Sequence, residues 1–100
     1  GLAPEALPSL VDHIRTLSRL EFMGLMALPP QSFGQRARRD FFITLRQLLE
    51  QLPTDPEIDR ANQLSMGMSD DLETAIASGA TWVRIGTAIF GARSKNGETL

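Results

Sequence analysis

Two short segments of the sequence combine glycine with hydroxyl side chains in a way that suits anion binding. Residues 65–69 read Ser-Met-Gly-Met-Ser, and residues 84–87 read Arg-Ile-Gly-Thr. A phosphate-like group can bind where a strand leads into a helix, because the first N–H groups of a helix are unpaired and carry partial positive charge. Glycine lets the backbone approach such a group, and hydroxyls add donors. The spacing therefore indicates a candidate anion site at two strand ends.

The two segments are expected to contribute differently. Two carboxylates, Asp70 and Asp71, directly follow Ser69 and would repel a dianion placed on the helix that begins there. We therefore expect Ser69 to contribute its hydroxyl, and the turn of Gly86 and Thr87 to supply most of the backbone N–H groups. A simpler interpretation, in which Ser69 only caps the helix, stays open.

Arg84 is the candidate cation of this site. Alternation along the expected strand places Arg84 on the same face as Trp82 and Gly86, opposite Val83 and Ile85. A buried guanidinium is costly without a partner, and a bound anion or a ring nitrogen would provide one. A salt bridge would provide one too, so the residues alone leave both interpretations open.

The first half of the chain predicts a helix, a strand and a second helix. A helix opens at Pro4 and starts late or bends at Pro8, with an apolar stripe at steps of three and four. A nearly continuous apolar run over 21–28 predicts a buried parallel strand. The second helix is expected over 33–52. Its apolar spine is Phe41, Leu45, Leu48 and Leu52, with Phe42 and Leu49 beside it.

The second half predicts two further strands, each followed by a helix. Residues 63–69 alternate as in a strand, and the next helix starts at Ser69 or Asp70 with an inward face of Leu72, Ala75 and Ile76. Gly79 is expected to end this helix. A strand over 81–85 then leads into a tight turn and one helical turn over 86–91.

Alternating helices and strands indicate an α/β fold. Parallel strands joined by right-handed crossovers are the usual solution for this order. In (β/α)8 TIM barrels, phosphate sites are often built from the loops after strands seven and eight, and the last two expected strands fit that arrangement. Residues 1–100 are therefore expected to be a single partial-barrel segment, with a polar C-terminal tail over 92–100.

A long contiguous segment resembles a known family. Residues 64–93, LSMGMSDDLETAIASGATWVRIGTAIFGAR, resemble the C-terminal signature of the pyridoxal phosphate homeostasis proteins, and residues 22–27, FMGLMA, resemble the strand before it. The resemblance implies the C-terminal part of an alanine-racemase-like, fold type III barrel. It also implies that Ser69, Gly86 and Thr87 hold the phosphate of pyridoxal 5'-phosphate, while Arg84 faces the pyridine nitrogen.

The resemblance also exposes a departure. Members of that family bind the cofactor as an aldimine on a lysine near the end of an early strand, whereas Lys95, in the polar tail, is the only lysine here. A complete barrel needs about 250 residues. We therefore expect that this chain alone does not form the native aldimine. Its open sheet edges predict self-association or a need for the missing N-terminal barrel half.

Three functions follow as hypotheses. The resemblance favours a non-catalytic carrier or buffer in pyridoxal phosphate homeostasis. A racemase or decarboxylase with the same barrel is the alternative, although no tyrosine is present and His13, expected to be structural, lies far from the strand ends. RNA binding through Arg36, Arg38 and Arg39 is a third, but these arginines are expected to be a solvated helix face.

Composition excludes several classes of function. The net charge of −2 and the pI near 5.3 argue against general binding to nucleic acid or anionic membranes. There is no cysteine and only one histidine, so a zinc site is not expected. No apolar run approaches the roughly 20 residues of a membrane helix, and no signal peptide is recognisable. Cytoplasmic residence is therefore expected.

Overall fold

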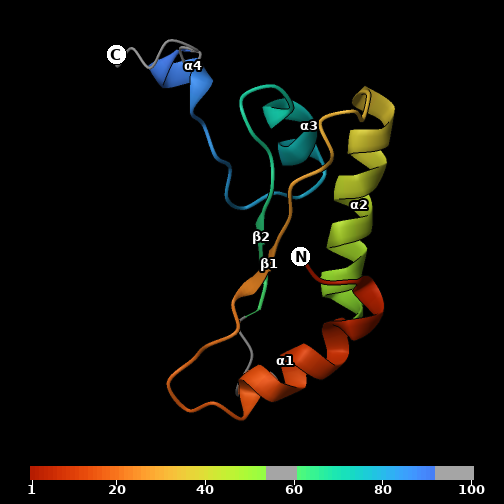
Figure 1. Ribbon diagram of the computed structural model, residues 1–100, viewed down its shortest axis with the longest axis vertical. Coiled ribbons are helices and arrows are strands. Elements are labelled where there is room, and N and C mark those ends of the chain that lie inside the picture. Colours follow the sequence, from red (N-terminus) through yellow and green to blue (C-terminus); the bar gives the residue numbers. More distant parts are fainter. Residues whose placement is uncertain (54–60, 92–100) are drawn as a thin grey trace.

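The computed structural model describes residues 1–53 and 61–91 and contains helices and parallel strands in alternation (Figure 1). The order of elements agrees with the prediction, except that residues 81–85 form no regular strand. The elements are the 3-10 turn η1 (Pro4–Ala6), α1 (Leu7–Arg15), β1 (Gly24–Met26), α2 (Gln35–Gln51), β2 (Gln63–Ser65), α3 (Leu72–Ala77) and α4 (Thr87–Phe90).

The first helix starts late, as its two prolines predict. Pro4 opens the 3-10 turn, and Pro8 lies in the first turn of α1, where its missing N–H costs no helical hydrogen bond. Leu7 and Val11 of the predicted stripe are buried, whereas Leu17 lies beyond the end of α1 and is exposed.

Parallel pairing joins three segments of the chain. Strands β1 and β2 pair in register, with Leu25 opposite Leu64. Residues 81–84 run along the other edge of β2, through a parallel bridge from Ser65 to Trp82. This pairing continues to a hydrogen bond of 2.9 Å from the N–H of Arg84 to the carbonyl of Gly67. The predicted parallel arrangement is therefore confirmed, and side-chain hydrogen bonds that join Thr81 and Trp82 to β2 add to the few backbone bonds of the third segment.

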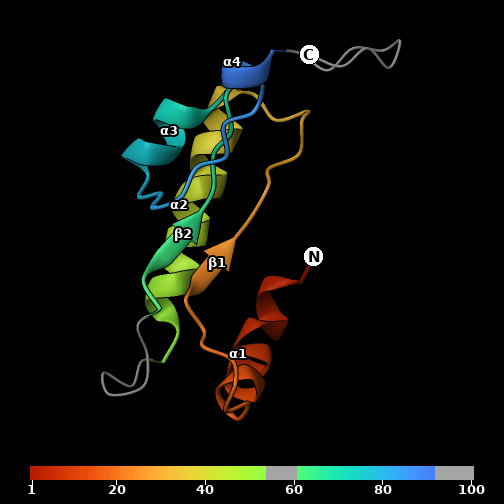
Figure 2. The same cartoon turned by 90° about the vertical axis from the view of Figure 1, so that its left-hand side faces the viewer.

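The prediction that residues 21–28 form a strand buried on both faces is wrong. Only Gly24–Met26 are a strand, and Met23, Met26 and Leu28 are 45%, 67% and 55% exposed. Helix α2 packs along one face of the strands (Figure 2), and no described element covers the other. A continuous apolar run cannot distinguish a strand covered on one face from a strand covered on two.

The core lies between the strands and α2. Phe42 is fully buried, and Leu49 and Leu52 are nearly so, whereas the predicted spine residues Phe41, Leu45 and Leu48 are half-buried. These three line an open groove of about 610 Å³ between α1, β1 and α2, which accounts for their exposure. The predicted helix is confirmed, and Leu52 of the predicted spine is buried, but the other buried residues of this helix, Phe42 and Leu49, are the two expected beside the spine.

Helix α3 is shorter than predicted and is capped differently. Asp71, not Ser69 or Asp70, occupies the N-cap position. Gly79 follows the helix at a φ of +107°, which confirms the predicted C-terminal glycine. Ala75 is buried as expected, but Ile76 is 55% exposed, so its predicted inward orientation is wrong.

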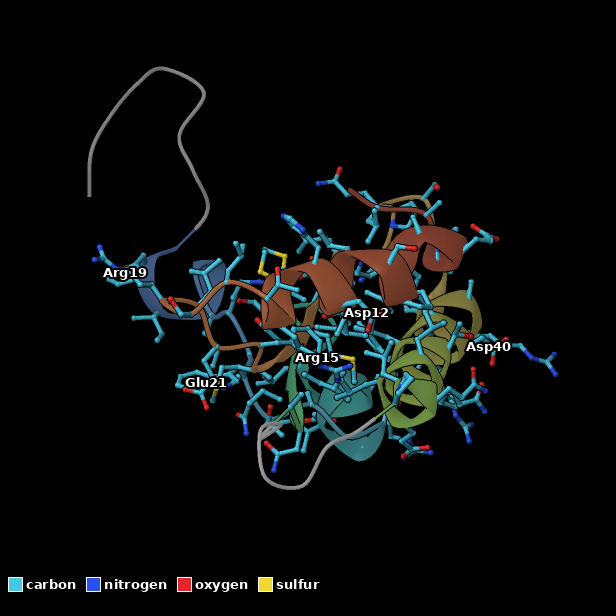
Figure 3. All side chains as sticks on the ribbon, turned by 90° about the horizontal axis from the view of Figure 1, so that it is seen from below. Asp12, Arg15, Arg19, Glu21 and Asp40 are labelled. Carbon is cyan, nitrogen blue, oxygen red and sulfur yellow. The ribbon has the colours of Figure 1, made fainter. Side chains whose placement is uncertain are left out.

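A side-chain contact ties the N-terminal helix to the end of α2. Arg15, labelled in Figure 3, donates a hydrogen bond of 2.6 Å to the carbonyl of Pro53 and lies 3.6 Å from the carboxylate of Asp12. The charged side chains of Arg19, Glu21 and Asp40 are exposed. Within residues 1–53 and 61–91, no helix has the length and apolar character needed to cross a membrane.

Candidate functional site

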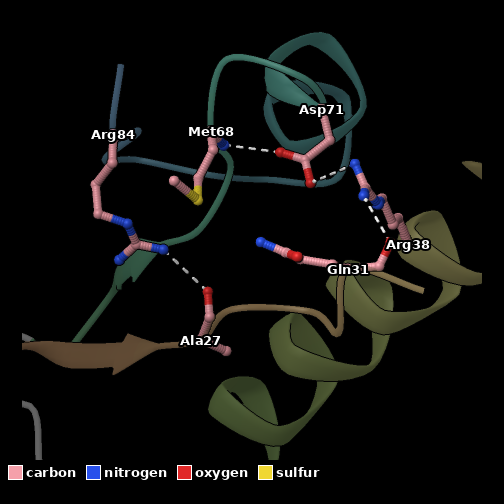
Figure 4. A network of polar contacts seen from close by, with 6 residues as sticks. All are labelled: Ala27, Gln31, Arg38, Met68, Asp71 and Arg84. Atoms are coloured by element: carbon pink, nitrogen blue, oxygen red, sulfur yellow. Dashed lines mark hydrogen bonds and ion pairs between the residues drawn. The ribbon is translucent and has the colours of Figure 1, made fainter. Parts of the chain in front are cut away.

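Arg84 connects the carboxyl ends of the three parallel segments. Its Nη1 donates to the hydroxyl of Ser65 at 3.1 Å, and its Nη2 donates to the carbonyl of Ala27 at 3.1 Å (Figure 4). The side chain is half-buried, so it does not extend into solvent. Both of these partners are neutral, and no ion pair of Arg84 is found among residues 1–53 and 61–91.

One nitrogen of the same guanidinium has no hydrogen-bond partner among the described residues. This nitrogen, the Nε of Arg84, is buried. A buried N–H without a partner is costly, and a ligand atom can provide that partner. Arg84 lines an open pocket of about 430 Å³ together with Ser65, Trp82 and strand β1. This pocket lies on the strand face that the helices leave uncovered.

Gly86 leaves open space at the end of the third segment. A Cβ atom built on Gly86 would meet no atom within 4 Å. The N–H groups of Ile89 and Phe90 bond to the carbonyl of Gly86, which confirms the predicted turn into a short helix, α4. The first N–H groups of such a turn have no partner inside it. The side chain of Thr87 lies outside the described residues.

Ser69 is carried by a tight turn over residues 68–71. The N–H of Met68 donates to Oδ1 of Asp71 at 2.7 Å, and the N–H of Asp71 donates to the carbonyl of Met68 at 3.2 Å. Gly67 precedes the turn at a φ of +99°. The close approach expected at this glycine is made by α3, since a Cβ on Gly67 would lie 2.5 Å from the Cβ of Ala75.

A salt bridge from α2 holds this turn, and sequence reasoning missed it. Arg38 Nη1 lies 3.5 Å from Oδ2 of Asp71, and Arg38 Nη2 donates to the carbonyl of Gln31 at 3.4 Å (Figure 4). Arg38 was expected on a solvated face, but it is half-buried, while Arg36 and Arg39 are exposed. No local pattern links residues that are 33 positions apart, so this pair could not be predicted from the sequence.

His13 does not join the site. His13 is exposed, so no structural role of its ring is supported, and its carbonyl oxygen accepts the N–H and the hydroxyl of Thr16. Among residues 1–53 and 61–91, no three acidic or histidine side chains gather as a metal site would require. Lys95 and the tail over 92–100 lie outside the described residues.

Parallel pairing brings the two predicted anion-binding segments to the same ends of neighbouring strands. The bond between Arg84 and Gly67 is the last backbone contact between them, and Ser69 and Gly86 each follow two residues later. Arg84 and Ser65 are in direct contact. That Ser69, Gly86 and Thr87 share one anion stays a prediction.

Comparison with known proteins identifies the sequence relatives. The family described as alanine racemase, N-terminal domain, matches residues 1–94. The pyridoxal phosphate homeostasis protein of Pseudomonas aeruginosa is 50% identical over 93 residues, which are 93% of this chain and 38% of that protein. The protein of the same name from Escherichia coli K12 is 42% identical over 93% of this chain and 39% of its own length. The resemblance to this group is therefore confirmed, and the chain spans about two fifths of these relatives.

Solved structures agree with the sequence relatives. PipY of Synechococcus elongatus, determined with PLP bound, superposes with a TM-score of 0.83 at 33% identity over 91% of this chain and 43% of that one. A crystal structure described as that of an unknown protein from Bifidobacterium adolescentis gives a TM-score of 0.81 at 38% identity over 90% of this chain and 36% of that one. These superpositions support the predicted α/β fold over most of the chain, and not only over the two short strands β1 and β2.

One part of the fold prediction needs correction. The chain was expected to be the C-terminal portion of its barrel, but the matching family describes an N-terminal domain and covers residues 1–94. The comparisons therefore assign this region to an N-terminal domain, not to a C-terminal one. The resemblance rests on two short segments, 64–93 and 22–27, and short segments identify a family more firmly than they identify a position within a larger architecture.

Proposed function

Because the chain belongs to the family of the alanine racemase N-terminal domain, we propose that it forms part of a protein that binds pyridoxal 5'-phosphate and contributes to its homeostasis. The PLP-bound PipY structure and the curated homeostasis proteins support this cofactor. The observation in this chain that carries the proposal is the environment of Arg84. Its guanidinium is held by Ser65 and Ala27, and its Nε is buried without a hydrogen-bond partner in the described part of the chain.

Arg84 is proposed to face the pyridine nitrogen of the cofactor. A guanidinium is always charged and can only donate, so it favours a neutral ring nitrogen that accepts a hydrogen bond. A positive charge nearby also disfavours protonation of that nitrogen. When bound, pyridoxal phosphate supplies an electron sink, and an unprotonated ring is the weaker sink. Arg84 would therefore restrain carbanion chemistry and suit a carrier more than a catalyst.

The phosphate is proposed to bind at the neighbouring strand end. Gly86 leaves room where a side chain would intrude, and the first amide groups of the turn that follows would donate to the phosphate oxygens. Ser69 would add its hydroxyl from the turn over 68–71, and Thr87 would add a further donor. The whole protein is proposed to complete a (β/α)8 barrel, of which residues 1–94 supply parallel strands and their covering helices.

A non-catalytic role is proposed, and a racemase or decarboxylase is the rival. Such enzymes place acid–base groups on the cofactor faces. The described pocket beside Arg84 is lined by no histidine, lysine or carboxylate. Racemisation of amino acids by the reconstituted full-length protein decides between the two, and clear turnover would overturn the carrier assignment.

Replacement of Gly86 by alanine in the full-length protein tests the phosphate site. The open space at Gly86 means that folding should be unaffected, whereas a methyl group there should weaken pyridoxal phosphate retention. Gly34→Ala is a matched control, because a Cβ at Gly34 also meets nothing within 4 Å and lies before α2. Thr87→Val should weaken retention as well. Retention equal to wild type in Gly86→Ala and Thr87→Val would remove this site assignment.

A further inference from the structure

We propose that the salt bridge between Arg38 and Asp71 is a positioning device for the phosphate end of the cofactor site. The inference rests on the proposed function, because it concerns the turn that carries Ser69. Neither Arg38 nor Asp71 is proposed to touch the cofactor. Their task is to fix the conformation of residues 68–71, so that the Ser69 hydroxyl is presented in one orientation.

The turn is closed from within by Asp71. Its carboxylate accepts the N–H of Met68, and its own N–H donates to the carbonyl of Met68, so Ser69 and Asp70 are enclosed between two hydrogen bonds. Gly67 fixes the entry to the turn, because its φ of +99° and its contact with Ala75 leave no room for a side chain. One side chain therefore determines the path of the backbone on either side of Ser69.

Arg38 fixes Asp71 from outside the turn. The Asp71 side chain is only 8% exposed and that of Arg38 21%, so solvent screens this pair much less than it screens a surface pair. The second terminal nitrogen of Arg38 reaches the carbonyl of Gln31, in the connection between β1 and α2. Arg38 thus links the turn to α2 and to the segment that follows β1.

Removing the charge of Arg38 would leave a buried carboxylate without its cation. Such a carboxylate gains free energy by moving towards water, and this movement weakens its hold on the Met68 N–H. Ser69 would then sample several orientations. Binding affinity should therefore decrease for ligands that carry a phosphate and stay unchanged for ligands that do not.

The test uses the full-length protein with pyridoxal 5'-phosphate and pyridoxal as paired probes. We expect Arg38→Gln and Asp71→Asn each to raise the Kd for pyridoxal phosphate about tenfold, and to leave the Kd for pyridoxal and the absorbance spectrum of the bound ring unchanged. Arg38→Lys should recover most of the affinity. Arg36→Gln and Asp70→Asn are matched controls, because both side chains are exposed neighbours of the pair, and both variants should bind as wild type does.

The outcomes separate this inference from the proposed function. A wild-type protein that binds no pyridoxal phosphate contradicts the function itself. A wild-type protein that binds, with Arg38→Gln and Asp71→Asn equally tight, overturns only the positioning role. Equal losses for the two probes would show a general structural role and would also overturn it. If Asp71→Asn does not fold, Arg38→Gln and Arg38→Lys still test the positioning role. Thermal unfolding of these two variants is measured in parallel, so that a loss of affinity can be separated from a loss of stability.

Discussion

The guanidinium of Arg84 donates to the carbonyl of Ala27 at 3.1 Å, although the two residues are 57 positions apart in the sequence. Ala27 directly follows β1, and Arg84 lies in the segment on the far side of β2. This one contact therefore crosses the middle strand and closes the carboxyl end of the sheet. It joins segments that have no backbone pairing with each other in the described residues.

Ser65→Ala is expected to loosen this closure without unfolding the protein. The serine hydroxyl is the other partner of Arg84, and a hydrogen bond to a charged group contributes about 1.5–3 kcal/mol. In the full-length protein, Arg84 should then hold the ring nitrogen less firmly. The pH at which the absorbance of bound pyridoxal phosphate changes should rise, because a guanidinium that is held less firmly opposes ring protonation less strongly.

Ser78→Ala serves as the control for that experiment. Ser78 is a buried serine whose hydroxyl donates to the carbonyl of Thr74 inside α3, away from Arg84. Its removal should lower stability by a similar amount and leave the spectrum as in wild type. An unchanged spectral midpoint in Ser65→Ala would argue against Arg84 as the partner of the ring nitrogen.

Gly67→Ala is expected to destabilise the fold strongly. Its φ of +99° is unfavourable for any L side chain, and the new Cβ would lie 2.5 Å from the Cβ of Ala75. Overpacking of this kind costs about 1–3 kcal/mol, and the backbone strain adds to it. Urea unfolding measures the difference. Gly34→Ala, which meets no neighbour, should change stability little, and equal midpoints for the two variants would contradict the described packing.

Phe42→Ala is expected to cost about 3–5 kcal/mol, because Phe42 is fully buried in the core between α2 and the strands. A domain of this size has little stability to spare, so the variant should be largely unfolded by circular dichroism. Phe90→Ala is the matched change at a side chain that is 62% exposed, and it should leave the unfolding midpoint near that of wild type. Similar unfolding midpoints for Phe42→Ala and Phe90→Ala would contradict the burial of Phe42 in the core.

The isolated 100-residue chain is expected to self-associate. Met26 in β1 and Met23 just before it are exposed, and exposed apolar surface at a strand favours association with other chains. Light scattering should give a mass well above the 11.0 kDa of one chain. Met26→Lys, at a side chain that is 67% exposed, should lower the measured mass without loss of stability. A discrete monomer with cooperative unfolding would contradict this prediction.

Local patterns predicted the helices and turns well. Prolines account for the late start of α1, and apolar spacing accounts for the length of α2. Glycines account for the end of α3 and for the turn before α4. Strand extent was predicted poorly, because it depends on which neighbours pair. The apolar run over 21–28 is long enough for a full strand, but only Gly24–Met26 pair with β2.

The side-chain contacts of the candidate site were not predicted from the sequence. Arg84 was named as a candidate, but its hydrogen bond to Ser65, 19 positions earlier, depends on the pairing of β2 with the third segment. The pairing of Arg38 with Asp71 depends on how α2 lies against α3, which no local pattern specifies. For the same reason Asp71 was considered only as a source of repulsion, whereas it organises the turn that carries Ser69.

The pairing between β2 and the segment after α3 also limits how the chain can vary in length. Ser65 lies beside Trp82, and the carbonyl of Gly67 meets the N–H of Arg84, so both contacts follow one register. Successive side chains of an extended segment alternate in direction. A single-residue insertion or deletion between Ala77 and Thr81 would therefore place Val83 or Ile85 beside Gly67 and turn the guanidinium away from Ser65. The length of the connection between α3 and Thr81 therefore determines which side chain reaches the strand ends. A change in this length would remove the guanidinium from the site as surely as a substitution of Arg84 would.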